Sequence, residues 1–176
     1  MKSTIAAAAV VTALVTAAVA PLGATFGASA AANPSLAPLV AHADWLAARP
    51  HQADLAGKVI VVDIFTFGCY NCKNVTPNLR ALYRRHDPHL AIVGIHTPET
   101  SYETDRKNVT TNLAAQGIVW PVAIDNDRAL WNAYDTQAWP TQLIFDKHGT
   151  LRKTIVGDSQ DQAVDDAVNS LLAESS

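Results

Sequence analysis

The chain contains two cysteines, Cys69 and Cys72, which are separated only by Tyr70 and Asn71. The pair follows an apolar run that ends at Phe65 and precedes a segment with helical periodicity. In the first turn of a helix, free backbone N–H groups and the helix dipole stabilise a thiolate, so we expect the pKa of Cys69 to lie well below its ordinary value. Cys72, one turn further on, is placed to attack a mixed disulfide formed at Cys69. The spacing therefore predicts a redox dithiol.

Two other uses of the cysteines have to be weighed. Together with His86 and His89 they have a spacing close to that of a zinc finger. A helix over 72–86 would, however, carry His86 about 20 Å from the cysteines at a rise of about 1.5 Å per residue, which is too far for one ion. We therefore expect no bound metal. A purely structural disulfide is the second alternative, although a loop this short constrains the unfolded chain little.

The composition narrows the classes of function. The 176 residues are 49% hydrophobic and 16% charged, and the formal net charge is −3. A slightly acidic chain lacks the excess of basic residues that binds nucleic acid, so we expect no nucleic-acid partner. Two cysteines exclude a scaffold held by several disulfides. The aromatic and β-branched residues after residue 58 argue against disorder.

The N-terminal segment is typical of a secretory signal. Lys2 precedes an apolar run rich in Ala and Val, and Ala-Ser-Ala at 28–30 supplies the small residues that a signal peptidase requires. We therefore expect residues 1–30 to be a signal peptide and the protein to be exported, periplasmic or extracellular, where disulfides persist. The alternative is an uncleaved membrane anchor, because the run over 4–20 is near the minimum length that crosses a bilayer.

The rest of the chain divides into a lead-in and one domain. Residues 31–56 are rich in Ala, Pro and His and are predicted to be a linker and lead-in segment, ahead of a domain over 57–176. Strands are expected at 58–65, 90–95, 119–124, 141–145 and 151–156, and helices at 70–86, 103–115, 127–134 and 159–173. This order predicts an α/β fold in which a central mixed β-sheet has helices on both faces.

Several of these features together resemble the active-site segment of thioredoxin-fold proteins. Asp63 lies six residues before Cys69, where that family has a buried acid. Pro77 lies eight residues after Cys69, where the family kinks its active-site helix. The tripeptide Trp139-Pro140-Thr141, which leads straight into a predicted strand, is similar to the cis-proline loop that faces the dithiol in the family.

Two further segments resemble one branch of that family. Gly94 to Glu99 and Asp125 to Tyr134 are similar to the TlpA-like proteins, and specifically to the soluble domain of DipZ-type thiol–disulfide reductases. The resemblance covers about residues 40–158. It implies a thioredoxin-like fold and a thiol–disulfide oxidoreductase activity that needs no cofactor.

The resemblance also implies roles for individual side chains. Cys69 would be the attacking thiolate and Cys72 the resolving thiol. Asp63 would exchange a proton with Cys72, which requires burial to raise the pKa of the carboxyl; the alternative is a buried carboxylate that is merely hydrogen-bonded. Glu99 would be an active-site acid of the TlpA-like type, or else a solvated loop residue.

The residues around the dithiol would bind the substrate. Pro140, if cis, would leave the backbone of Trp139 free to pair with a substrate main chain, whereas its alternative role is simply to begin a strand. Tyr70 and Asn71 replace the Gly-Pro of ordinary thioredoxin and would contact the substrate. Residues between the cysteines tune the redox poise, so this replacement leaves the direction of electron flow open.

The expected function is therefore an exported thiol–disulfide oxidoreductase that acts on protein disulfides or dithiols, as a reductase rather than an oxidant and as a monomer. The chain lacks the multi-span membrane region of fused DipZ-type proteins, so a reductase would need a separate membrane electron donor. Two alternatives stay open: a non-enzymatic binding module with an inert disulfide, and a thiol peroxidase. Thr66 to Cys69 has the T-x-x-C pattern of peroxiredoxins, although the proline expected at position 62 is Val62.

Overall fold

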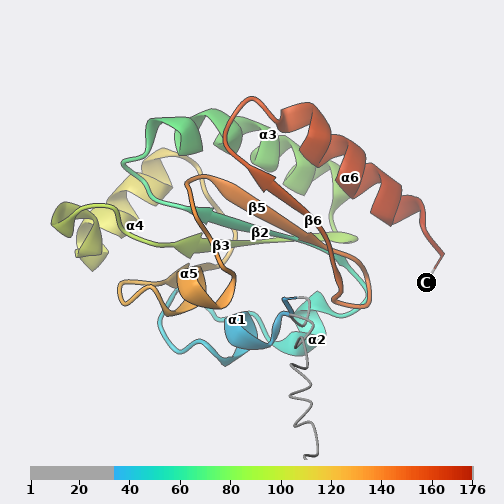
Figure 1. Cartoon of the computed structure of the whole chain (residues 1–176), viewed down its shortest axis with the longest axis horizontal. Helices are drawn as coiled ribbons and strands as arrows, with labels where there is room; N and C mark the ends of the chain where they lie inside the picture. The colour runs from blue at the N-terminus through green and yellow to red at the C-terminus, as the bar shows by residue number, and fades with distance from the viewer. Residues whose placement is uncertain (1–33, 176) are drawn as a thin grey trace, which may run out of the picture. The chain divides into compact units, whose positions relative to one another are not determined.

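The structure, a computed structural model, describes residues 34–175. The predicted signal peptide, residues 1–30, lies outside the described residues. Within 34–175, six strands form one mixed sheet in the order β1-β4-β3-β2-β5-β6 (Figure 1). The strands are β1 (Trp45–Leu46), β2 (Val59–Phe65), β3 (Leu90–His96), β4 (Val122–Ile124), β5 (Thr141–Phe145) and β6 (Leu151–Val156). The helices are α1 (Ala37–Ala41), α2 (Gln52–Leu55), α3 (Tyr70–His86), the 3₁₀ helix η1 (Ser101–Thr104), α4 (Arg106–Ala115), α5 (Ala129–Ala133) and α6 (Asp161–Ala173).

Strand β2 lies in the middle of the sheet and positions the cysteine pair. It runs parallel to β3 and antiparallel to β5, and all 7 of its residues are buried. An almost uninterrupted apolar run is what a strand covered on both faces requires. Asp63 is the only charged residue of this strand. Because β2 is followed directly by the loop 66–69 and then by α3, its end determines where Cys69 lies.

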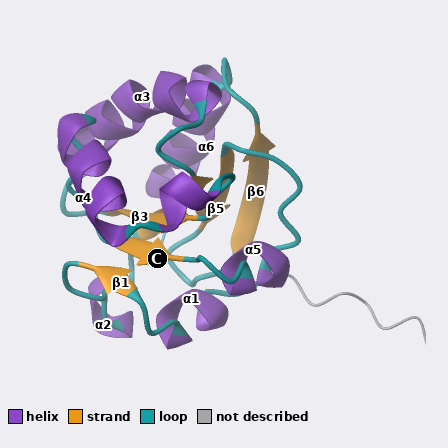
Figure 2. Cartoon of the chain, turned by 90° about the vertical axis from the view of Figure 1, so that its left-hand side faces the viewer, coloured by secondary structure: helices purple, strands orange, loops and turns teal. Residues whose placement is uncertain are grey.

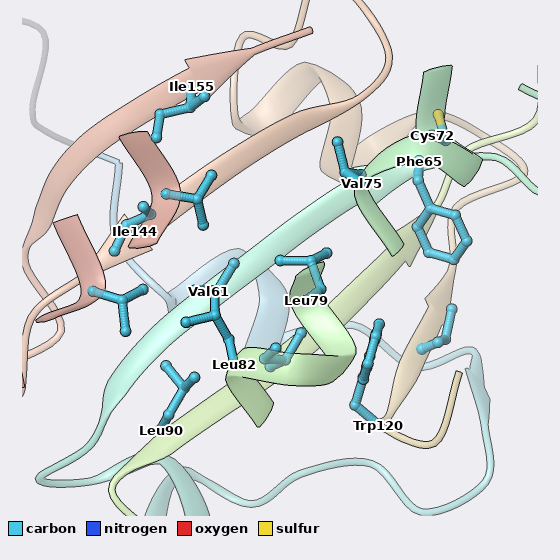
Figure 3. Close-up of a cluster of buried hydrophobic side chains, with 14 of the residues drawn as sticks. Val61, Phe65, Cys72, Val75, Leu79, Leu82, Leu90, Trp120, Ile144 and Ile155 are labelled. Atoms are coloured by element: carbon cyan, nitrogen blue, oxygen red, sulfur yellow. The ribbon is translucent and has the colours of Figure 1, made fainter. Parts of the chain in front are cut away.

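Helices cover both faces of the sheet, as the sequence pattern predicts (Figure 2). Side chains alternate along a strand, so Val61 and Phe65 of β2 pack against α3 and α6, whereas Ile60 and Val62 pack on the side of α1, α2 and α5. We call the first side the α3 face. Figure 3 shows the buried side chains of α3 over the strands on that face.

The lead-in segment contributes more to the fold than its composition indicates. Strand β1 pairs antiparallel with β4 at the edge of the sheet, and Trp45 is buried there. Leu39 of α1 and Leu55 of α2 are buried on the face opposite α3. A two-residue strand and helices of 5 and 4 residues are too short to show a hydrophobic period, so the sequence pattern does not reveal them.

The two predicted boundaries that differ most from the structure do so for local reasons. The strand expected from residue 119 begins at Val122, because Val119 is exposed and Pro121 has no N–H to donate to a neighbouring strand. The helix expected from residue 103 begins at Arg106. Asp105 caps it by accepting a hydrogen bond from the Asn108 N–H, and the preceding residues form η1.

Candidate active site

Cys69 and Cys72 are joined as a disulfide, with their Cα atoms 5.3 Å apart. Cys69 is the N-cap residue of α3, and its Sγ accepts a hydrogen bond from the Cys72 N–H at 3.2 Å. Cys69 is half-buried, whereas Cys72 is buried and packs with Val75 and Phe65 on the α3 face (Figure 3). A large partner can therefore approach the sulfur of Cys69 but not that of Cys72.

The loop before Cys69 is held by side chains from other elements. His96 Nε2, at the end of β3, accepts a hydrogen bond from the Phe67 N–H at 3.3 Å and lies 3.2 Å from the Thr66 hydroxyl. The rings of Phe67 and His96 stack with centroids 5.5 Å apart. Gln116 Nε2 donates to the Phe67 carbonyl at 3.2 Å. These contacts fix the course of the chain just ahead of Cys69.

Burial keeps the imidazole of His96 neutral. Desolvation lowers the pKa of His96 to about 4, and the nearby negative charge of Glu103 offsets only part of this effect. At neutral pH the ring therefore carries a lone pair on Nε2, which is what the Phe67 N–H requires of its acceptor.

Glu103 lies directly beneath the same loop and is buried. Its Oε1 accepts from the Gly68 N–H at 3.0 Å, and its Oε2 accepts from the N–H groups of Glu99 and Thr100, both at 2.8 Å. Burial raises the pKa of Glu103, but these hydrogen bonds and one from the Thr66 hydroxyl together bring it below its ordinary value. An ionised carboxylate therefore holds the residue that precedes Cys69.

The side chain of Glu99 is exposed, in contrast to that of Glu103. The backbone of Glu99 takes part in the site through its N–H, which donates to Glu103, but the Glu99 carboxylate makes no hydrogen bond within residues 34–175. The acid that contacts the loop is thus four residues later than the one that the sequence analysis selected.

Asp63 is buried on β2, directly opposite Gln142 of β5. Its position between Val61 and Phe65 places it on the α3 face, the face on which Cys72 is buried. Desolvation raises the pKa of Asp63 to about 7, and the hydrogen bond that Gln142 Nε2 donates at 2.9 Å offsets part of the rise. This carboxyl can therefore gain or lose a proton near neutral pH.

The Trp139–Pro140 peptide is cis and leads into β5. The Trp139 ring is half-buried against Trp131, with ring centroids 4.3 Å apart, and its Nε1 donates to the Thr97 carbonyl at 3.1 Å. The guanidinium of Arg128 lies 5.2 Å from both tryptophan ring centroids. By contrast, the backbone N–H and carbonyl of Trp139 have no hydrogen-bond partner within residues 34–175.

Two tyrosines are exposed, one between the cysteines and one against the loop that precedes them. Tyr70, between the two cysteines, is 77% exposed, and Asn71 is exposed as well. Tyr102 of η1 is 63% exposed and packs edge-on against the Phe67 ring. Tyrosine is enriched at protein–protein interfaces.

The histidines of the zinc alternative lie away from the cysteines. Helix α3 is continuous over 17 residues, so Cys72 and His86 are at opposite ends of it. In the described part of the chain, no group of three or more His, Cys, Asp and Glu side chains is arranged to hold a metal ion. None of the helices in that part is long and apolar enough to cross a membrane.

Comparison with known proteins agrees with this geometry. Residues 57–151 match the family described as thioredoxin-like. The chain belongs to the thioredoxin-like family. Protein DipZ of Mycobacterium tuberculosis is 34% identical over 119 residues, which are 67% of this chain but 17% of DipZ. Thiol-disulfide oxidoreductase YkuV of Bacillus subtilis is 27% identical over 137 residues, 77% of this chain and 93% of YkuV.

The fold comparison agrees as well. The solution structure of a thioredoxin-like protein in the oxidized form superposes with a TM-score of 0.73 at 26% identity, over 82% of this chain and 98% of that one. The predicted thioredoxin-like fold with a central mixed sheet is therefore confirmed. The chain spans less than a fifth of the length of DipZ, so the comparison covers only that fraction of DipZ.

Sequence reasoning about this thioredoxin-like chain missed three side chains of the site. Glu103 is the last residue of a Thr-x-x-Glu pattern that begins at Thr100, the signature of a capping box. Gln142 is a polar residue directly before three apolar ones in β5, opposite the one acid of β2. His96 ends β3 in the same way, as a polar residue after an apolar run. The three residue types are visible in the sequence, but the elements that they face are known only from the structure.

Proposed function

We propose that this protein exchanges disulfides with protein substrates through the Cys69–Cys72 pair, with Cys69 as the attacking sulfur. The observation that carries the proposal is the unequal exposure of the two sulfurs. Cys69 is accessible at the N-terminus of α3, where backbone N–H groups stabilise a thiolate, whereas Cys72 is buried and bonded to Cys69.

The reaction in the reducing direction has two steps. The Cys69 thiolate attacks one sulfur of a substrate disulfide, forms a mixed disulfide and releases the other substrate sulfur as a thiolate. Cys72 then attacks Cys69 Sγ, which re-forms the Cys69–Cys72 disulfide and releases the second substrate sulfur. The two electrons pass from the dithiol to the substrate, and the two substrate thiolates take up protons.

The second step requires that Cys72 lose its proton in a buried environment. Asp63 is the acceptor that we assign, because its carboxyl lies on the α3 face and titrates at about pH 7. In the oxidising direction the same carboxyl would return the proton to Cys72.

The substrate main chain would bind beside Pro140. The N–H and carbonyl of Trp139 have no partner within residues 34–175, while the Trp139 ring is held by Trp131 and Arg128. The fixed ring orients a backbone that is available to pair with an extended peptide. The exposed side chains of Tyr70 and Asn71 would contact the same substrate.

We further propose that the protein is exported, works in the periplasm or outside the cell as a reductase, and receives electrons from a separate membrane donor. The signal-like pattern of residues 1–30 and the resemblance to DipZ-type reductases support this. The reduction potential of the pair tests the direction. A value near about −270 mV, that of thioredoxin, is expected for a reductase, whereas one near about −120 mV would mark an oxidant.

Two matched serine variants test the roles of the sulfurs. Cys69→Ser should abolish reduction of insulin disulfides, and normal turnover by this variant would refute the proposal. Cys72→Ser should retain attack but not resolution, so mixed disulfides with substrate proteins should accumulate on Cys69 and be released by dithiothreitol. If the wild-type pair shows no reversible couple, the inert binding module replaces the enzyme.

A further inference from the structure

Gln142 is a fully buried amide in the middle of the sheet. Leu143, Ile144 and Phe145, which follow it in β5, are all apolar and buried. The Gln142 Nε2 donates to Asp63 Oδ1 at 2.9 Å, but its Oε1 has no hydrogen-bond partner within residues 34–175. Burying an unpaired carbonyl is unfavourable for the fold, so packing alone does not account for a glutamine here.

An amide suits a carboxyl that changes its protonation state. The ionised Asp63 can only accept hydrogen bonds, and the Gln142 Nε2–H donates to it. The protonated Asp63 has an O–H to donate, and rotation of the terminal amide would bring the unpaired Oε1 of Gln142 to the same position as acceptor. A leucine could serve neither state, and a lysine would serve only the ionised one.

Within residues 34–175, the strands beside Asp63 and the helices that cover its face bring no other charge against it. On the neighbouring strands its partners in register are Gly94 and Gln142, both uncharged. Helices α3 and α6 cover the same face, and Cys72 is the only titratable side chain among their buried residues. Burial raises the pKa of Asp63, and the Gln142 hydrogen bond lowers it in part.

We propose that Gln142 is a positioning residue for proton transfer between Asp63 and Cys72, and that its amide holds the Asp63 carboxyl in both protonation states. The inference rests on the proposed function, in which Asp63 exchanges a proton with Cys72. The inference goes beyond the proposed function by assigning a role to a side chain that does not touch the sulfurs or the substrate.

Gln142→Met tests the proposal, because methionine matches the length of glutamine but cannot hydrogen-bond to Asp63 in this way. Methionine bonds to neither protonation state, and the bond that it removes from the ionised form is the stronger of the two, so the pKa of Asp63 should rise by about one pH unit, as observed by ¹³C NMR of its carboxyl. The rate at which Cys72 resolves a mixed disulfide between Cys69 and glutathione can be measured by stopped flow. The pH profile of this rate should shift by the same amount. At pH 7 the rate should fall about fivefold, because the ionised fraction of Asp63 falls from about one half to about one tenth.

Leu143→Met is the matched control, because Leu143 is buried on the opposite face of β5 and the substitution changes the core by a similar amount. It should leave the pH profile of resolution unchanged. If Gln142→Met does not fold, Gln142→Asn, whose shorter side chain withdraws the amide from Asp63, should shift the profile in the same direction.

Asp63→Asn separates failure of this inference from failure of the proposed function. If Asp63→Asn leaves the pH profile of resolution unchanged, Asp63 is not the proton acceptor and the proposed proton transfer fails, whatever Gln142 does. If Asp63→Asn removes the transition near pH 7 but Gln142→Met leaves the wild-type transition where it is, the role of Gln142 is overturned and the proposed function stands.

Discussion

Gly68 precedes the attacking cysteine, and one contact explains why this position has no side chain. A Cβ atom added to Gly68 would lie 2.2 Å from Oε1 of Glu103. The φ of Gly68 is outside the left-handed region, so the backbone itself would accept an alanine. Gly68→Ala should therefore act through Glu103 alone.

The size of the effect follows from the hydrogen bond that the alanine would break. To make room, the carboxylate of Glu103 must move away from the Gly68 N–H, to which it is bonded at 3.0 Å. A hydrogen bond to a charged group contributes about 1.5–3 kcal/mol. Alanine offsets about 0.4–1 kcal/mol of this loss by restricting the unfolded chain. We expect Gly68→Ala to lower the free energy of unfolding by about 1–2 kcal/mol.

A double-mutant cycle isolates the contact. In a Glu103→Ala background neither the clash nor the hydrogen bond exists, so Gly68→Ala should be neutral or stabilise by up to about 1 kcal/mol. Urea denaturation of the four oxidised proteins, followed by circular dichroism, gives the coupling free energy, which we expect to be about 2 kcal/mol. A coupling below about 0.5 kcal/mol would mean that Glu103 is not what excludes a side chain at position 68.

Three further predictions concern Asp63, Arg128 and Tyr70. Folded Asp63 keeps a proton that the unfolded chain releases above its ordinary pKa of 3.8, so the contribution of Asp63 to the free energy of unfolding should fall by about 3–4 kcal/mol between pH 4 and 7, against the rise that His96, with its lowered pKa, contributes over the same range. In urea denaturation Asp63→Asn should abolish this fall, and an unchanged slope would contradict the raised pKa. Arg128→Met removes the cation 5.2 Å from two tryptophan rings and should lower the free energy of unfolding by about 1–2 kcal/mol, with altered fluorescence of Trp139. Tyr70→Ala, at an exposed position, should change stability by less than about 0.5 kcal/mol and raise KM for a protein substrate. KM for glutathione disulfide should stay the same; an equal rise for both would argue against contact with the protein substrate.

The central part of the fold was predictable because its sequence signals are local. The strand that ends at Phe65, the helix that begins after Cys69 and the hairpin around Gly149 each have a period or a turn residue of their own. Segments that are ordered by contacts with the rest of the fold were not predictable. Strand β1 consists of only two residues, and its place at the edge of the sheet depends on β4, which lies far along the chain.

The same distinction explains which acids of the site could be found. Asp63 could be selected because a charge in a buried strand is conspicuous and its distance from Cys69 is a sequence property. Glu99 and Glu103 are both acids after β3, and only the path of η1 decides which of them turns under the loop. Gln142 becomes informative only when β5 is known to lie beside β2 in a particular register.

The two buried carboxylates of the site show how the same chemical group acquires two functions. Asp63 and Glu103 are 2% and 4% exposed, so burial acts on both in the same direction. Asp63 receives a single hydrogen bond from a neutral amide, and its pKa rises to about 7. Glu103 receives several, mostly from backbone N–H groups, and its pKa falls below the ordinary value. The number of donors therefore decides that Asp63 can carry a proton while Glu103 stays a fixed charge that holds the loop.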